Sequence, residues 1–339
     1  MNSKLSAGKV IFLLFLIVGT IYIIRNNQKP YINNRGEVFG TYYNITYQSK
    51  TGLHQEIKNV LEQVNASLSP FNRNSIITAI NNNEDAVPDS MFITVFSLAQ
   101  EISEKTGGAF DITVAPLVNA WGFGFKKGLP VDSMAIDSLR NLVGYKKVSL
   151  VDGKVVKQNP GTMLDCSAIA KGYGCDVVAS MFDRHGINNY MIEIGGEVVA
   201  KGNNASGKRW GIGINKPVDD PLASNKELFG VVRLDGKGMA TSGNYRNFRY
   251  IDGKKVAHTI NPHTGYPVTH SLLSATVIAG DCATADALAT AFMVMGLEAS
   301  LAHCKQHGID ALFIYSTDDG TLQTKETEQF GKYRLTCKF

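Results

Sequence analysis

The feature that most constrains the fold is the irregular order in which helix-like and strand-like segments follow one another. Residues 54–67, 89–105, 168–182 and 284–295 have the apolar spacing of helices. Strand-like segments are interspersed among them, at residues 41–47, 148–151, 154–156, 190–194, 210–214, 228–234 and 273–279. Because these segments do not form regular βαβ units, their order favours an α+β fold with mixed or antiparallel sheets and packed helices over a doubly wound parallel sheet.

The N-terminus carries a separate signal, an apolar run between basic residues. Lys4 and Lys9 precede residues 10–24, which contain no charged residue, and Arg25 follows. This pattern predicts an N-terminal membrane segment over residues 1–25, although at ~1.5 Å per residue the run covers roughly 22 Å of a ~30 Å hydrocarbon core. Since no small-residue cleavage site follows, it favours an uncleaved anchor over a cleaved signal peptide. Residues 26–36 are then a linker, and residues 37–339 form one exported domain.

Composition and missing motifs exclude several classes of protein. The formal net charge of +4 is small for 339 residues, and no run of Lys and Arg marks a nucleic-acid surface. The sequence contains no P-loop and no complete dinucleotide fingerprint. Its five cysteines include no C-x-x-C pair, so they predict neither a zinc ribbon nor a thioredoxin-type site. These absences argue against a nucleic-acid partner and against a P-loop or Rossmann nucleotide site.

Residues 284–295 carry a carboxylate and a hydroxyl on one helix face. Asp286 and Thr290 are spaced as i and i+4, so their side chains point the same way. The rest of the segment is apolar, and a carboxylate there is costly to bury unless it meets a metal or a hydrogen-bond donor. An aspartate, a hydroxyl and waters suit a hard ion such as Mg²⁺. The alternative is that Asp286 only complements the positive N-terminus of its own helix.

A titratable imidazole stands at the start of a loop that proline and glycine shape. His258 precedes Pro262 and Gly265, and catalytic groups collect on such loops when a rigid scaffold holds them. His258 is therefore a candidate general base, and the alternative is a structural histidine. His263 and His270 lie nearby, but their spacing fits no standard zinc site.

Other segments suit an anion or a planar ligand. Asp165 precedes a predicted helix and Lys171 lies near its start, so the helix N-terminus and the lysine would together attract an anion. The alternative is an aspartate N-cap followed by an exposed lysine. Small-residue turns at residues 107–108, 195–196 and 241–243 would let a planar ligand approach the backbone.

Taken in chain order, these segments resemble the FAD:protein FMN transferases, the ApbE family. The resemblance covers roughly residues 36–330, and its motifs are modest singly but specific in this order. They are Gly40-Thr41-x-Tyr43, Gly108 through Gly124, Leu164 through Tyr173, Glu193-Ile194-Gly195-Gly196, Thr241-Ser242-Gly243, His258 through Pro267, and Ala285-Asp286 with Thr290. The resemblance implies an α+β fold with two subdomains.

It also implies a reaction and a set of site residues. The chain would be a transferase that takes FAD as donor substrate and Mg²⁺ as cofactor. It would join FMN through a phosphoester to a threonine or serine of a target flavoprotein and release AMP. His258 would act as general base, and the carbonyl of Ala168 with the side chains of Asp286 and Thr290 would hold Mg²⁺. The FAD site would be lined by Phe39, Phe71, Ala109, Phe110, Asp111, Asp165, Lys171 and Ile260.

Three residues depart from the family pattern. Phe39 stands where methionine is usual, which changes a flavin contact without removing apolar surface. His263 replaces a usual arginine and so removes a permanent cation, and Asn261 replaces a common aspartate. The lipoprotein cysteine of the family is also missing, because no cysteine precedes Cys166.

Two other functions could use the same residues. An Mg²⁺-dependent FAD pyrophosphatase would release FMN and AMP to water, and a non-catalytic carrier would only hold FAD. The combination of His258 with Asp286 and Thr290 favours catalysis over carriage. By resemblance, the acceptors would be membrane electron-transfer subunits, and the expected location is the bacterial inner membrane with the catalytic domain on the periplasmic side.

Overall fold

A computed structural model describes residues 7–27, 29–126, 132–217, 227–245, 248–251 and 254–334. The helices are α1 (Ala7–Asn27), α2 (His54–Leu68), α3 (Ile76–Asn81), α4 (Ser90–Lys105), α5 (Ala115–Ala120), α6 (Ser133–Arg140), α7 (Ala170–Arg184), α8 (Cys282–Met295) and α9 (Leu297–His307), with 3-10 turns η1 (Tyr145–Lys147) and η2 (Phe330–Tyr333). The strands are β1 (Tyr31–Val38), β2 (Thr41–Gln48), β3 (Val148–Val151), β4 (Lys154–Lys157), β5 (Tyr190–Ile194), β6 (Glu197–Lys201), β7 (Trp210–Asn215), β8 (Leu228–Leu234), β9 (Lys237–Gly243), β10 (Phe248–Ile251), β11 (Lys254–Ala257), β12 (Leu272–Ala279), β13 (Asp310–Ser316) and β14 (Leu322–Glu326).

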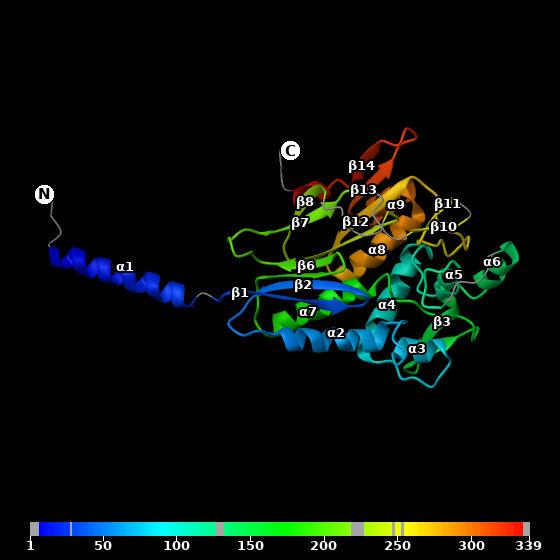
Figure 1. Cartoon of the computed structure of the whole chain (residues 1–339), viewed down its shortest axis with the longest axis horizontal. Coiled ribbons are helices and arrows are strands. Elements are labelled where there is room, and N and C mark those ends of the chain that lie inside the picture. Colours follow the sequence, from blue (N-terminus) through cyan, green and yellow to red (C-terminus); the bar gives the residue numbers. More distant parts are fainter. Residues whose placement is uncertain are drawn as a thin grey trace.

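The predicted N-terminal membrane segment is wrong. Ala7–Asn27 form α1, which projects away from the body of the molecule (Figure 1). No helix in the described part of the chain is both long and apolar enough to cross a membrane. The reason is the length of the uncharged run at 10–24, since roughly 15 residues at ~1.5 Å each fall short of a ~30 Å hydrocarbon core.

The α+β part of the predicted fold class is confirmed by a central eight-stranded sheet. Its strand order is β1-β2-β5-β6-β9-β12-β13-β14. Every neighbouring pair in this sheet is antiparallel. Two hairpins are inserted around β9: β7–β8 precede it in the chain and β10–β11 follow it. The loop that carries His258 therefore connects the β10–β11 hairpin to the central strand β12.

The first strand covers residues that the sequence assigned to a linker. Tyr31–Val38 pair along their whole length with Thr41–Gln48. The connecting residues Phe39 and Gly40 have positive φ values of 53° and 71°, as a tight two-residue hairpin turn requires. A phenylalanine in this conformation is strained. Its ring lies against Gly174 of α7, where a Cβ atom would come within 2.8 Å of it.

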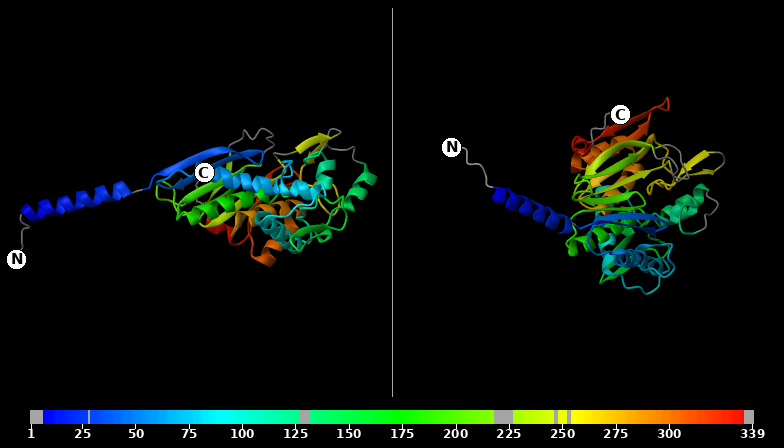
Figure 2. Two further views of the ribbon diagram at one scale, coloured as in Figure 1. Left: turned by 90° about the horizontal axis from the view of Figure 1, so that it is seen from below. Right: turned by 60° about the vertical axis from the view of Figure 1, so that its left-hand side comes forward.

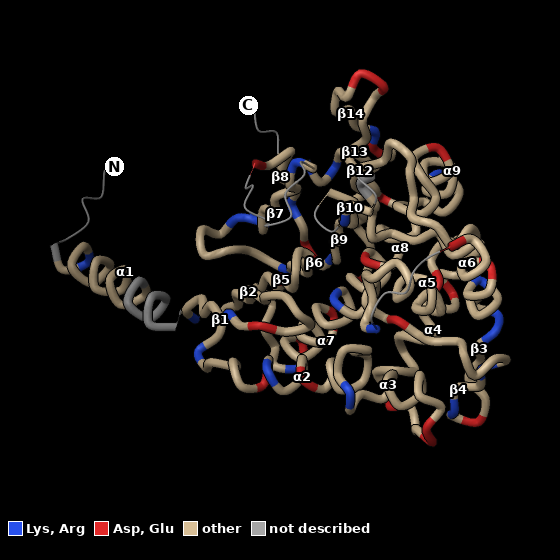
Figure 3. Tube along the Cα trace, turned by 45° about the vertical axis from the view of Figure 1, so that its right-hand side comes forward, with Lys and Arg blue, Asp and Glu red and all other residues tan. Residues whose placement is uncertain are grey.

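Two layers cover the sheet. One face is covered by α7 and α8, with α2 and α4 packed outside them (Figure 2). The other face packs against the β7–β8 hairpin through Trp210, Ile212 and Leu234. Lysines and arginines are interspersed with acidic residues over the described body (Figure 3). The helices α7 and α8 are therefore supported along one face by the central sheet.

The two covering helices approach each other closely at a glycine. A Cβ atom on Gly172 would lie 2.3 Å from the carbonyl oxygen of Cys282, so no larger residue fits there without movement. Cys166, Cys175, Cys282 and Cys304 are all buried and unpaired. Cys337 lies outside the described residues.

A smaller core stands beside the main one. Leu117, Ile136, Val143 and Ile260 form it, and they bring α5 and α6 against the loop that follows β11. The candidate site opens between this smaller core and the ends of α7 and α8.

Candidate active site

One cavity of about 870 Å³ brings together all the residues that the sequence predicted for the site. It is lined by Phe39, Phe71, Ala109, Phe110, Asp111, Asp165, Ala168, Lys171, His258, Ile260, Asp286 and Thr290, among others. A cavity of this volume is in the usual range for small-molecule sites. The individual role of each residue stays a prediction.

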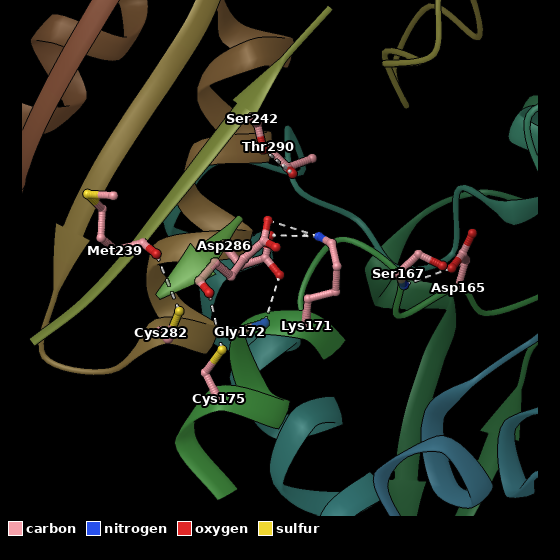
Figure 4. A network of polar contacts seen from close by, with 11 residues as sticks. Asp165, Ser167, Lys171, Gly172, Cys175, Met239, Ser242, Cys282, Asp286 and Thr290 are labelled. Carbon is pink, nitrogen blue, oxygen red and sulfur yellow. Dashed lines mark hydrogen bonds and ion pairs between the residues drawn. The ribbon is translucent and has the colours of Figure 1, made fainter. Parts of the chain in front are cut away.

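Three charged side chains that line the cavity lie close together, and we call them the charged floor: Lys171, Glu197 and Asp286. Lys171 Nζ donates a hydrogen bond to Glu197 Oε1 at 3.0 Å and lies 3.7 Å from Asp286 Oδ1. The backbone N–H of Gly172 donates to Asp286 Oδ2 at 3.1 Å (Figure 4). The N-terminus of α7, predicted as an anion site, therefore already holds a carboxylate of the protein itself.

Burial and charge act against each other on this floor. Burial lowers the pKa of Lys171, but the carboxylates of Asp286 and Glu197 outweigh it, so the pKa rises above its ordinary value and the ammonium stays charged. Burial raises the pKa of Glu197 above its ordinary value, and the Lys171 ammonium opposes that rise. Lys171 is thus a permanent cation held between two acidic groups.

The structure assigns the capping of α8 to residues other than Asp286. Asp281 is the N-cap, and its side chain accepts from the N–H of Thr284 at 2.7 Å. Asp176 of α7 accepts from the N–H groups of Cys282 and Ala283. Since these two aspartates already satisfy the helix N-terminus, Asp286 is left to face the cavity, where only 2% of its surface is exposed.

Oxygen donors that suit a hard ion line the same cavity as Asp286. Thr290 Oγ1 lies one helical turn further along α8 and 3.1 Å from Ser242 Oγ of β9 (Figure 4). Ala168, whose carbonyl was predicted as a ligand, lines the same cavity. In the residues that the structure describes, no group of three or more His, Cys, Asp and Glu side chains could hold a metal. A carboxylate, a hydroxyl and a backbone carbonyl are hard oxygen ligands of the kind that Mg²⁺ takes beside several waters, so the chemistry of this donor set fits that ion.

Asp165 and Asp111 hold neighbouring segments in place at the cavity wall. Asp165 Oδ1 accepts from the N–H of Ser167 at 2.8 Å, so it makes a local turn before α7 and does not cap the helix. Asp111 accepts from Thr113 and from the N–H of Tyr145 at 2.7 Å. Burial raises the pKa of both aspartates, and their hydrogen bonds oppose the rise. Both carboxylate oxygens of Asp111 are thus already engaged within the protein.

Three aromatic residues of one segment, which we call the aromatic rim, contact segments around the cavity: Trp121, Phe123 and Phe125. Phe123 itself lines the cavity, and two of the three contacts go to the loop that carries His258. The ring centroid of Trp121 is 5.9 Å from that of Tyr266, Phe123 is 6.4 Å from His258, and Phe125 is 6.1 Å from Phe71. The Arg249 guanidinium of β10 lies 5.3 Å from the centre of the Phe123 ring. This single short segment therefore links the His258 loop, strand β10 and the segment that carries Phe71.

Two contacts to the backbone hold the far end of the loop that carries His258. Trp121 Nε1 donates to the carbonyl of Gly265 at 2.9 Å, and Ile260 pairs with Pro267. Asn261 Oδ1 accepts from the N–H of His263 at 2.8 Å, as an aspartate there also could. His263 lies against Gly108, where a Cβ atom would come within 3.1 Å of the imidazole. Of the departures from the family pattern, the one at 261 thus keeps its local hydrogen-bond role.

Three of the cavity residues that sequence reasoning missed contact predicted site residues. Glu197 follows the Gly195–Gly196 turn and begins a buried strand, which is a signal that could have marked it. Ser242 was noted only as part of a small-residue turn, although it bonds to Thr290. Phe123 appeared only within a matching segment, and its contact with His258 depends on tertiary structure.

Comparison with known proteins establishes the class and then the family. The fold and the charged cavity describe an α+β enzyme, and the model of the ApbE family matches residues 39–313. The chain belongs to the ApbE family. It is 36% identical to the FAD:protein FMN transferase of Vibrio cholerae serotype O1, over 89% of this chain and 93% of the relative. It is also 36% identical to the protein of that name in Haemophilus influenzae, over 90% and 92%.

Solved structures agree with this assignment. The flavin transferase ApbE from Vibrio cholerae superposes with a TM-score of 0.80 at 35% identity, over 90% of this chain and 99% of that one. The apo form of the flavinyl transferase ApbE from Pseudomonas stutzeri gives a TM-score of 0.80 at 31% identity, over 91% and 98%. The predicted family is confirmed, and so is the prediction that the chain is a transferase.

Proposed function

We propose that this chain is an FAD:protein FMN transferase. It moves the FMN part of FAD to a threonine or serine hydroxyl of an acceptor flavoprotein, releases AMP, and depends on Mg²⁺. Relatives that are 36% identical carry this enzyme name. The observation that carries the proposal is that one cavity gathers His258, Lys171, Asp286, Thr290 and the remaining predicted site residues.

The reaction is a phosphoryl transfer and balances without any further reactant. The acceptor oxygen bonds to the phosphorus of the FMN phosphate as the bond from that phosphorus to the bridging oxygen breaks. AMP leaves with the bridging oxygen, and the hydroxyl proton goes to His258. Such a reaction needs positioning and charge neutralisation more than covalent help from the protein.

Each charged residue then has one task. Lys171 offers a permanent positive charge to the pyrophosphate of FAD. Asp286, Thr290 and the carbonyl of Ala168 would hold Mg²⁺, which when bound neutralises charge on the phosphates. His258 stands half-buried beside the aromatic rim and takes the acceptor proton. The FAD itself would contact Phe39, Phe71, Ala109, Phe110, Asp111, Asp165 and Ile260.

A direct assay tests this function. The full chain is incubated with FAD and Mg²⁺, with an acceptor flavoprotein and with the same acceptor after its threonine is changed to alanine. Transferase activity gives flavin fluorescence and the added mass of FMN on the unaltered acceptor alone, with one AMP for each FMN attached. AMP release without an acceptor indicates the FAD pyrophosphatase instead. FAD binding with neither product indicates the carrier.

The location of the body is also our proposal. A basic flank and an apolar run at residues 10–24 precede the body, as in exported proteins. This proposal does not depend on a membrane-spanning helix. Protease added to spheroplasts should digest the body, and full protection until the cells are lysed would contradict export.

A further inference from the structure

Glu197 is the member of the charged floor that no sequence motif marked. It is the first residue of β6, lines the cavity, and is only 5% exposed. Its Oε1 accepts from Lys171, whereas its Oε2 has no hydrogen-bond partner among the described residues. A buried carboxylate oxygen without a partner costs free energy, and in a native structure it calls for an explanation.

The position of Lys171 indicates what this carboxylate does through its other oxygen, Oε1. Its ammonium lies 3.0 Å from Glu197 but 3.7 Å from Asp286, so it is hydrogen-bonded to the first and only near the second. An ammonium paired closely with Asp286 would compete with a divalent cation for the same carboxylate. In the observed arrangement, Asp286 Oδ2 accepts from the Gly172 N–H, and the approach of the ammonium to Oδ1 stops beyond hydrogen-bond distance.

We propose that Glu197 is a positioning residue that holds the Lys171 ammonium away from Asp286, so that the Asp286 carboxylate stays open to a divalent cation. Without the charge of Glu197, the lysine would move onto Asp286 and occupy its free oxygen. Oε2 of Glu197 is buried and has no hydrogen-bond partner among the described residues, so Glu197 engages the lysine through Oε1 alone. This inference rests on the metal part of the proposed function.

The test measures cation binding by the full chain without FAD or acceptor. Mn²⁺ serves as the probe, its free concentration is followed by electron paramagnetic resonance, and Mg²⁺ is used in competition. The variants are Glu197→Gln and, as the matched control, Glu193→Gln. Glu193 pairs with Val198 across the β5–β6 hairpin, so it lies on the opposite face of the sheet from Glu197.

We expect Glu197→Gln to raise the dissociation constant of Mn²⁺ about tenfold, the size usual for residues that orient a metal site. Glu193→Gln should leave it unchanged. Glu197→Asp, which keeps the charge on a shorter side chain, should give an intermediate value. Thermal unfolding checks each fold. If Glu197→Gln does not fold, Glu197→Asp carries the test, and parent-like Mn²⁺ affinity in it overturns the proposal.

A double-mutant cycle with Lys171→Met tests whether Glu197 acts through the lysine. With Lys171 gone, no ammonium competes for Asp286, so Glu197→Gln should weaken Mn²⁺ binding far less than in the parent. Equal losses in both backgrounds would overturn the proposal, as would no loss in either. A parent chain that binds no Mn²⁺ overturns it together with the metal part of the proposed function. FMN transfer, assayed separately, then decides whether the transferase proposal survives.

Discussion

The charged floor and the aromatic rim share one cavity but are built by opposite means. The floor takes Lys171, Glu197 and Asp286 from α7, β6 and α8, and the two carboxylates are almost completely buried. The rim takes its three aromatic residues from positions 121, 123 and 125 of one segment, and its contact Phe71 is 63% exposed. A buried ionic cluster fails when one member is removed, because the others lose compensation. The aromatic rim is partly buried and uncharged, so it loses only the contacts of the residue that changes.

His258 is the residue that could break this comparison, because it contacts the rim and yet is our proposed base. His258→Ala should lower FMN transfer by about 10²–10⁴-fold, the usual contribution of a general base. FAD binding should persist, because the base acts on the acceptor hydroxyl. The measurement is the transfer rate across pH together with the FAD dissociation constant.

The matched control is His185→Ala. His185 is an exposed histidine that pairs with Glu56 at the surface, so its loss should leave transfer unchanged. A His258→Ala chain that transfers FMN at the parent rate across pH would make His258 a structural residue of the rim.

Asp286→Ala should give the next largest effect, and it tests the charged floor. At a Mg²⁺ concentration that saturates the parent, transfer should fall on the order of a hundredfold, and the variant should need much more Mg²⁺. Thr290→Ala should shift the Mg²⁺ requirement in the same direction, because both side chains face one cavity. Activity titrated against Mg²⁺ measures both variants.

Asp281→Ala is the control on the same helix. Asp281 caps α8, so its loss should cost about 1 kcal/mol of stability and leave the Mg²⁺ response as it was. An unshifted Mg²⁺ response in Asp286→Ala would rule out the metal assignment, even if the chain proves to be a flavin transferase.

Phe123→Ala tests the rim and should have a smaller effect. The variant loses an aromatic contact with His258 and the stacking of Arg249, each worth about 1 kcal/mol. Because both contacts lie within the protein, only part of their combined loss, about 2 kcal/mol or thirtyfold, reaches the bound FAD. FAD affinity should therefore fall about tenfold or less, while the Mg²⁺ requirement stays that of the parent. Phe123→Leu, which keeps most of the apolar surface, should lie between the two. A shifted Mg²⁺ requirement in Phe123→Ala would show that floor and rim are coupled.

The sequence predicted the elements whose signals are local. Apolar spacing marked α2, α4, α7 and α8 to within a few residues of their observed bounds, and Asp-Gly marked the β3–β4 turn. It marked β1 poorly, because β1 is an edge strand of the sheet and its residues Asn33, Asn34 and Arg35 read as a polar linker.

The floor could be predicted only in part, because burial is set by tertiary structure. Asp286 stood out as a carboxylate in an apolar helix, whereas Glu197 opens a short strand like many surface residues. Its burial follows from the pairing of β6 with β5 and β9, which no local pattern encodes. The pairing of Lys171 with both acids likewise joins residues distant in the chain.

The last predicted effect is on stability and concerns Asp176, which supports the charged floor by capping α8 from α7. Burial, with the neighbouring charges of Asp281 and Asp286, raises the pKa of Asp176 to about 7, although hydrogen bonds from Cys282 and Ala283 oppose the rise. Between about pH 4 and pH 7, the folded chain therefore holds a proton on Asp176 that the unfolded chain, with an ordinary aspartate, has released. The contribution to stability is complete below pH ~4 and is lost as the pH rises toward 7, by about 1 kcal/mol per pH unit.

Asp176→Asn keeps an oxygen acceptor for both N–H groups but cannot titrate. The melting temperature of the variant minus that of the parent should therefore rise from pH 5 to pH 7 and stay constant above pH 7. Thermal unfolding of both chains at half-unit pH steps measures this. If this difference in melting temperature instead falls as the pH rises, the ionised carboxylate stabilises the N-terminus of α8 more than burial opposes it.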